Sequence, residues 1–139
     1  MSYKILSKFI KDISFEIPTA KAFALLEKEV TKYNLNFEIK GSPFKGKIVE
    51  VNTILRMVPT QEVKHKILTE INISALVSIE KNFEDKKELE KIILIKIPNE
   101  TYPTLYETFV YLFSKAGVQN IRIEKEVNFE KMYNERNKI

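Results

Sequence analysis

The sequence predicts a single α+β domain in which an antiparallel sheet comes first and helices follow. Apolar and polar residues alternate with a period of two in several stretches before about residue 80, which is typical of strands with one buried and one wet face. After that point the spacing of apolar residues becomes helical. Strands that all precede the helices indicate an antiparallel sheet. A chain of 139 residues fits one domain, spanning 1–139.

The first strand is predicted from Phe9 to Ile17. Its odd-numbered positions from 13 to 17 are apolar, and Pro18, which cannot donate to a ladder, ends it. The opposite face carries Asp12 and Glu16. A strand needs apolar residues to hold it, but it does not need paired acids in a basic chain. The two carboxylates are therefore candidates for a function on the wet face.

Two further strands are predicted, separated from the first by a long connection over Thr19–Lys47. Within this connection Ala20–Lys32 has helical composition but a poor apolar stripe, and residues 35–39 could form a short strand. The second main strand is expected over Lys47–Val58. The third stretch, Val63–Ile79, is the longest alternation in the chain and is rich in β-branched residues. It exceeds an ordinary strand of ~5–6 residues, so it is expected to form either one long bent strand or two pieces.

Helices are predicted in the last third of the chain. Residues 83–97 are rich in Lys, Glu, Leu and Ile, and a proline then stops or kinks the helix. Residues 102–116 follow amphipathic spacing and end at Gly117, a natural left-handed C-cap. Asn128 is expected to cap a final helix over residues 129–137.

Composition excludes several classes of protein. With no cysteine, the chain has neither disulfides nor thiolate zinc sites. It has no apolar run near the ~20 residues of a membrane span, so we expect a soluble cytoplasmic protein without direct membrane insertion. The lysines that give a net charge of +4 are interspersed with acids, which predicts no nucleic-acid partner. A basic nucleic-acid-binding module, supported only by the pI near 9.1, is the less favoured alternative.

The sequence contains no pattern that indicates a catalytic site. The one histidine, His65, falls on the apolar side of the third predicted strand, where a packed histidine is commoner than a base. The three glycines form no phosphate loop, and no carboxylate pair is tied to a nucleophile. We therefore expect no enzyme, no cofactor and no metal.

Aromatic residues are the more suggestive feature. Six Tyr and nine Phe are generous for a small core. Five of them lie on the helix predicted over residues 102–116: Tyr102, Tyr106, Phe109, Tyr111 and Phe113. Tyr111 lies off the main apolar stripe of this helix. The surplus predicts self-association, a hydrophobic binding groove, or both.

Several strings resemble the SecB family of export chaperones, over about residues 9–133. Lys11–Pro18, which reads Lys-Asp-Ile-Ser-Phe-Glu-Ile-Pro, resembles that family's first strand, and Ile54–Met57 its second. Leu68–Ile79 is similar to its third and fourth strands, and Val127–Phe129 to the start of its last helix. The resemblance implies a four-stranded antiparallel sheet with a long kinked helix and a C-terminal helix on one face. It also implies a homotetramer, built as a dimer of dimers with helices sandwiched between the sheets.

The function that the resemblance implies is ATP-independent holding of unfolded preproteins and their transfer to the translocase ATPase SecA. A chaperone dedicated to an antitoxin or other specific client is the alternative. Docking of the SecA-type partner would use Asp12, Glu16, Leu68 and Glu70. The client groove would use Phe23, Leu35, Phe37, Phe44, Phe129, Met132 and Tyr133. The oligomer interface would use Tyr102, Leu105, Tyr106, Phe109, Tyr111, Leu112 and Phe113. Ordinary packing or solvation is the competing interpretation of each position.

The chain departs from the family's pattern in three ways. It is basic, whereas familiar SecB chains are acidic. Tyr102–Tyr106 replaces the usual aromatic-Pro-Tyr-x-Arg string of the long helix, and Arg136 and Lys138 stand where an acidic tail is usual. These departures bear on SecA docking more than on the fold.

Overall fold

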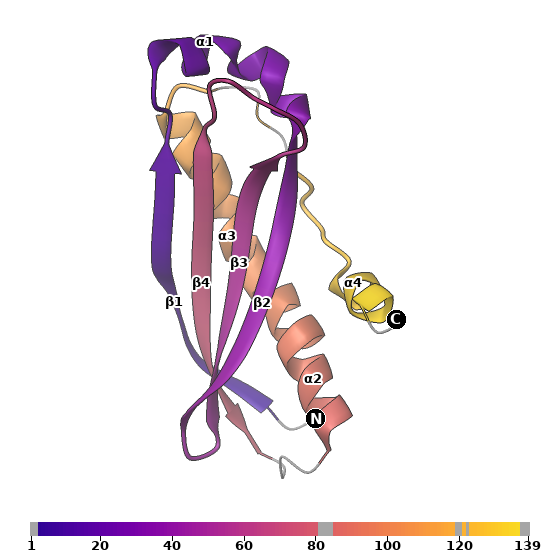
Figure 1. Cartoon of the computed structure of the whole chain (residues 1–139). Coiled ribbons are helices and arrows are strands. Elements are labelled where there is room, and N and C mark those ends of the chain that lie inside the picture. Colours follow the sequence, from indigo (N-terminus) through magenta and orange to yellow (C-terminus); the bar gives the residue numbers. More distant parts are fainter. Residues whose placement is uncertain (1–2, 81–84, 119–120, 122, 137–139) are drawn as a thin grey trace.

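Four antiparallel strands form one sheet, and a long helix crosses one of its faces (Figure 1). The computed structural model describes residues 3–80, 85–118, 121 and 123–136. In chain order the elements are β1 (Tyr3–Glu16), α1 (Ala20–Glu29), a 3-10 turn (Val30–Lys32), β2 (Tyr33–Lys45), β3 (Ile48–Pro59), β4 (Leu68–Ile79), α2 (Lys86–Lys91), a π-helical turn (Ile92–Lys96), α3 (Ile97–Lys115) and α4 (Phe129–Arg136). The strand order is β1-β4-β3-β2, so β1 and β2 are the edges. The predicted α+β class and four-stranded antiparallel sheet are confirmed.

The strand assignments need three corrections. The predicted connection over residues 19–47 contains α1 and a full strand, β2, which pairs with β3 from Tyr33 to Lys45. Gly41 and Pro43 obscure its alternation, and an edge strand tolerates both residues. β1 starts at Tyr3, six residues before the predicted strand. Leu68–Ile79 forms one strand, not two.

The alternation over residues 63–67 belongs to the loop between β3 and β4. Val63 and Ile67 are buried there, and the Ile67 amide donates to Tyr33 Oη at 3.1 Å. The alternation thus comes from a loop folded back onto the core. His65 lies in this loop, half-buried, and not on a strand as predicted.

The long kinked helix is made of α2, the π-helical turn and α3, which follow one another without a break. Asp85 Oδ1 accepts from the Glu88 amide at 3.1 Å and caps the start. Pro98 sits in the first turn of α3, so the helix continues through it. The predicted caps are confirmed: Gly117 has a φ of +95°, and Asn128 Oδ1 accepts from the Lys131 amide at 2.8 Å. The predicted helix ends at residues 83 and 137 lie outside the described part.

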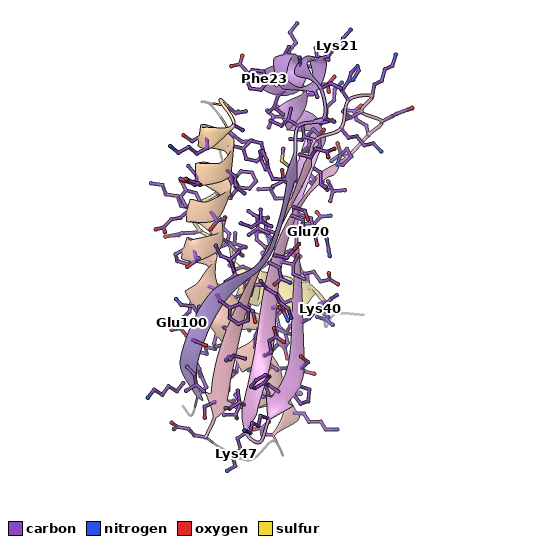
Figure 2. The ribbon with its side chains drawn as sticks, turned by 90° about the vertical axis from the view of Figure 1, so that its left-hand side faces the viewer. Lys21, Phe23, Lys40, Lys47, Glu70 and Glu100 are labelled. Atoms are coloured by element: carbon purple, nitrogen blue, oxygen red, sulfur yellow. The ribbon has the colours of Figure 1, made fainter. Side chains whose placement is uncertain are left out.

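The main core lies between α3 and the inner face of the sheet, while Glu70 and Lys40 lie on the face turned away from α3 (Figure 2). The largest fully buried side chains are Phe109, Phe113, Phe129, Leu55, Ile71, Ile73, Ile97 and Leu105. α1 closes one end of the sheet, and α4 lies beyond the β2 edge (Figure 1). Among the described residues, no helix is long and apolar enough to cross a membrane.

Candidate functional site: an acidic sheet face and an aromatic hollow

The four predicted docking residues share one patch on the outer face of the sheet. Glu16 on β1 is the register partner of Leu68 on β4, and Glu70 is the partner of Ser14. Asp12 pairs with Asn72. Register partners point to the same face of a sheet, so the structure brings Asp12, Glu16, Leu68 and Glu70 together. Leu68, the first residue of β4, is 49% exposed beside Glu16 at one end of this patch.

A basic residue on β3 modifies this acidic patch. Arg56 Nε donates to Glu70 Oε1 at 3.0 Å, and Arg56 Nη1 donates to Glu38 Oε1 at 2.8 Å. The Arg56 hydrogen bond holds the pKa of Glu38 below its usual value. No salt bridge within the described part of the chain involves Asp12 or Glu16. Asp12 and Glu16 therefore supply the carboxylate charge of the patch that is not in a salt bridge, while the Glu70 carboxylate is paired with Arg56.

A shallow hollow adjoins this patch at the α1 end of the sheet. Its volume is about 560 Å³, and Glu16, Arg56, Lys66, Leu68 and Glu70 are part of its lining. An apolar side chain flanked by charges of both signs suits a partner that presents an apolar residue among polar ones.

A second hollow lies between α4, β2 and the π-helical turn. Its volume is about 230 Å³, and its lining comprises Phe37, Ile39, Leu94, Phe129, Met132, Tyr133 and Arg136. Four of the seven predicted groove residues therefore meet around one cavity. We call it the aromatic hollow. Because α4 forms one wall, the position of that short helix decides its shape.

Ring contacts fix the walls of the aromatic hollow. The Phe37 and Phe129 rings meet edge to face with centroids 5.5 Å apart, and Phe129 meets the Tyr102 ring at 6.0 Å. Tyr133 Oη donates to Glu90 Oε2 at 3.0 Å and ties α4 to α2. Tyr102 Oη donates to the Glu124 carbonyl, and burial above all raises the pKa of Tyr102 to about 12. The phenol thus stays neutral as a structural donor.

The other three predicted groove residues lie elsewhere. Phe23, on α1, has ring atoms 3.5 Å from where a side-chain carbon at Gly117 would stand. Leu35 packs half-buried against the main core. Phe44 is 59% exposed near the turn between β2 and β3, five residues from Ile39 or roughly 16 Å along an extended strand. None of the three lines the aromatic hollow.

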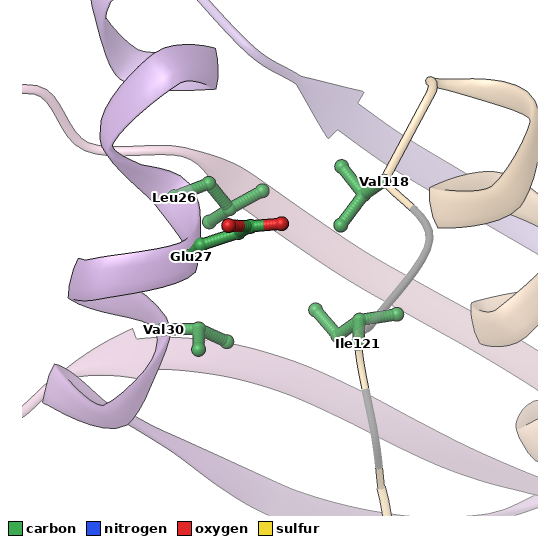
Figure 3. Close-up of a pocket in the computed structure, with 5 residues that line it drawn as sticks. All are labelled: Leu26, Glu27, Val30, Val118 and Ile121. Carbon is green, nitrogen blue, oxygen red and sulfur yellow. The ribbon is translucent and has the colours of Figure 1, made fainter.

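A third hollow contains residues that sequence reasoning missed. Leu26, Glu27 and Val30 face Val118 and Ile121 across a cavity of about 260 Å³ (Figure 3). Phe23 lies close by, because it contacts Gly117, which precedes Val118. The available signal was the row of apolar residues in the linker between the last two helices, at positions 118, 121, 123 and 127. A solvated linker does not need them.

The structure corrects the predicted oligomer interface. Tyr102, Leu105, Phe109 and Phe113 are buried in the core of their own chain. They cannot also offer surface to a second chain. Tyr106 and Leu112 are half-buried, and Tyr111 is 60% exposed. The prediction therefore remains open for these three residues.

The structure thus combines an open sheet face that carries the acidic patch with apolar hollows beside α1 and α4. The chain belongs to the SecB family of protein-export chaperones: the family model described as Preprotein translocase subunit SecB matches residues 1–139. This agrees with the resemblance found in the sequence.

Individual relatives agree with the family assignment. A candidate protein-export protein SecB of Pelagibacter ubique (strain HTCC1062) is 38% identical over 97% of this chain and 96% of its own length. The Protein-export protein SecB of Nitrosospira multiformis is 28% identical over 96% of this chain and 82% of its own length. Among solved structures, a SecB-like chaperone of Mycobacterium tuberculosis, in complex with a ChAD peptide from the HigA1 antitoxin, superposes with a TM-score of 0.69. It is 14% identical and covers 91% of this chain and 88% of its own. That last likeness concerns the fold.

Proposed function

We propose that this protein is an ATP-independent chaperone that binds unfolded preproteins, keeps them competent for export and passes them to a SecA-type translocase ATPase. The observation that carries the proposal is the aromatic hollow, where Phe37, Phe129 and Met132 line a cavity open to solvent. A chaperone that receives preproteins before their export acts in the cytoplasm. We expect no catalytic activity and no cofactor.

Client retention follows from the size and number of the hollows. A cavity of about 230 Å³ accepts one or two apolar side chains of an extended segment. Each fully buried side chain contributes roughly 1.5–3 kcal/mol, which is too little to retain a client alone. Hollows on several subunits raise the effective concentration of the next segment, so weak contacts sum. Folded proteins hide such side chains and are not bound.

Transfer of the client is assigned to the acidic patch on the outer face. Asp12 and Glu16 supply free negative charge, and Leu68 supplies the apolar contact. These groups suit a partner surface with a basic rim around an apolar pocket. The patch faces away from α3, so a client held on the helix side does not block it.

We expect assembly into a dimer of dimers, supported by two apolar surfaces. β1 is an edge strand with exposed apolar side chains, at Leu6, Phe9, Ile10 and Ile13, and unpaired strand edges recruit another strand. Tyr106, Tyr111 and Leu112 on α3 supply the second surface. Light scattering should then give about four times the chain mass of 16.3 kDa. A stable monomer would remove this part of the proposal.

The test of the holding function is suppression of aggregation of a chemically unfolded preprotein, without nucleotide. Soluble complexes on light scattering support the proposal, and aggregation at the unassisted rate contradicts it. The double variant Asp12→Asn with Glu16→Gln tests docking separately. It should weaken binding to the translocase ATPase at least tenfold while client retention stays unchanged. The matched control, Glu130→Gln on α4, should change neither.

A chaperone dedicated to an antitoxin is the second candidate, favoured by the fold shared with the mycobacterial chaperone in its antitoxin-peptide complex. A dedicated chaperone should prefer one client segment by a large factor. Competition between a panel of unrelated unfolded preproteins decides the matter. Equal displacement by all of them supports general export, and displacement by one alone supports the dedicated role.

A further inference from the structure

The turn between β2 and β3 forms a projecting tip at the end of the sheet opposite α1 (Figure 2). Lys45 pairs with Ile48, which leaves Gly46 and Lys47 as the turn residues. Gly46 has a φ of +55°, as tight hairpin turns require at that position. A side-chain carbon placed on Gly46 would meet no atom within 4 Å. The space on the side-chain side of Gly46 is therefore open.

The backbone of the turn is hydrogen-bonded to the rest of the sheet. The Ile79 amide on β4 donates to the Lys47 carbonyl at 2.9 Å, so the turn is bonded to a third strand. The position of Lys47 is therefore set by β4 as well as by its own hairpin.

The residue that projects is aromatic. The pairing of β2 with β3 shifts between Pro43 and Lys45, which leaves Phe44 as an unpaired bulge residue. Bulges re-aim side chains, and the Phe44 side chain is 59% exposed. The ring is therefore available for contact with a partner.

Two lysines, Lys45 and Lys47, accompany Phe44 in the hairpin. Lys4 and Ile48 both pair with Ser78, and Lys45 pairs with Ile48. Lys4 therefore stands on the opposite edge of the sheet from Lys45, roughly 14 Å away, and the lysines beside Phe44 are Lys45 and Lys47. No acid occurs between Glu38 and Glu50 in the sequence.

Neighbouring acids do little to cancel these lysines. Glu50 is paired with Lys11 at 2.7 Å, and Glu38 is paired with Arg56 at 2.8 Å. Glu80, directly after β4, is an exposed acid at this end of the sheet. The net charge of the described residues around the tip is therefore positive.

We propose that this tip binds the surface of an anionic lipid bilayer, with the Phe44 ring at the headgroup boundary and Lys45 and Lys47 against acidic headgroups. An apolar ring with flanking cations matches a bilayer surface, which is apolar below and anionic above. Each lysine near an anionic surface multiplies the affinity about fivefold.

A bilayer fits this geometry better than single-stranded nucleic acid does. Proteins that bind single strands use a basic groove with successive stacking rings, whereas the hairpin over residues 44–47 carries one ring, that of Phe44, and lines none of the hollows described above. The expectation of no direct membrane insertion concerned spanning segments. A ring roughly 5–10 Å deep in the interface needs no span. The tip lies on the β2 side of the sheet, so pairing through the β1 edge leaves it free.

The absence of tryptophan from the chain makes a direct test available. Phe44→Trp places a single fluorescent reporter at the tip, and Phe23→Trp places a control at the opposite end, where Phe23 is 44% exposed. Both are mixed with phosphatidylcholine vesicles, with and without phosphatidylglycerol. We expect a blue shift of the Phe44→Trp emission on anionic vesicles only. Flotation of the unmodified protein with the same vesicles should agree.

Charge reversal completes the test. Lys45→Glu with Lys47→Glu should lower the fraction bound to anionic vesicles by more than tenfold, with unchanged urea unfolding. The proposal is overturned if the Phe44→Trp emission does not respond to vesicles, or if Phe23→Trp responds equally. It is also overturned if an unfolded client, and not the vesicles, shifts the emission. That result would mean that Phe44 contacts clients, as the sequence analysis predicted. Binding to an oligonucleotide without binding to vesicles would overturn it as well.

Discussion

Replacing Phe129 by alanine tests whether α4 and the aromatic hollow depend on one side chain. Phe129 is 1% exposed and is the first residue of α4. Its ring meets the rings of Phe37 and Tyr102 edge to face. α4 has eight residues, too few to persist as an isolated helix. We therefore expect Phe129→Ala to release α4 from the β2 edge.

The size of the effect follows from these contacts. Removing a buried Phe side chain costs about 3–5 kcal/mol, of which each edge-to-face ring pair supplies about 0.5–1.5 kcal/mol. Phe129 borders a hollow that water can enter, so little empty space is trapped. The expected loss in the free energy of unfolding is therefore at the low end, about 3 kcal/mol.

Urea unfolding followed by circular dichroism measures this loss, and amide hydrogen exchange over residues 129–136 locates it. Met132→Ala is the matched control. Met132 is half-buried in the same cavity, so its loss should cost about 1 kcal/mol yet weaken client binding. A change below about 1 kcal/mol for Phe129→Ala, or unchanged exchange in α4, would refute the reasoning.

Two further predictions concern the sheet. Arg56→Ala should return the pKa of Glu38 toward its ordinary value, because the Arg56 hydrogen bond is the main cause of its lowering; carboxyl NMR titration measures this. A lowered folded pKa gives stability above the unfolded value of about 4.3 that is lost as the pH falls further, so the variant should lose less stability than the parent on acidification. Gly41→Ala should destabilise the fold by about 1 kcal/mol, because its Cβ would lie 2.9 Å from Ile93 Cγ2.

Each of these two predictions has its own control. Lys40→Ala should change the pKa of Glu38 less than Arg56→Ala does, since the Lys40 contact is longer, at 3.8 Å. Equal changes would contradict the assignment to Arg56. For Gly41, the double variant with Ile93→Ala should be no less stable than Ile93→Ala alone. A cost that persists there would mean that Ile93 is not the obstacle.

The sequence located most of the secondary structure where local rules apply. The N-terminal KDISFE string was correctly placed on a strand, and Gly117 and Asn128 were correctly identified as helix caps. Capping depends on side chains within three or four residues, so the sequence alone carries the signal. β2 was predicted only as a short strand over residues 35–39, because Gly41 and Pro43 interrupt its alternation; its pairing with β3 extends it from Tyr33 to Lys45.

The docking patch and the aromatic hollow differ in how far the sequence could define them. Alternation along β1 put Asp12 and Glu16 on one wet face, since a strand fixes the direction of every second side chain. Only the register of β4 placed Leu68 beside Glu16, and only the packing of strands brought Arg56 to Glu70. The spacing of residues along the long helix indicated that it carries more aromatic residues than one face needs. It did not indicate which of these rings are buried within their own chain.

The sequence by itself thus determined the fold class, the helix caps and the polarity of each strand face, because these depend on neighbours in the chain. The tertiary structure decided which distant side chains meet: Phe37 with Phe129 in the aromatic hollow, and Phe44 alone at the tip. Contacts between residues far apart in sequence depend on register and on the docking of α4. Those are set by the summed burial of the whole core, which no local pattern records.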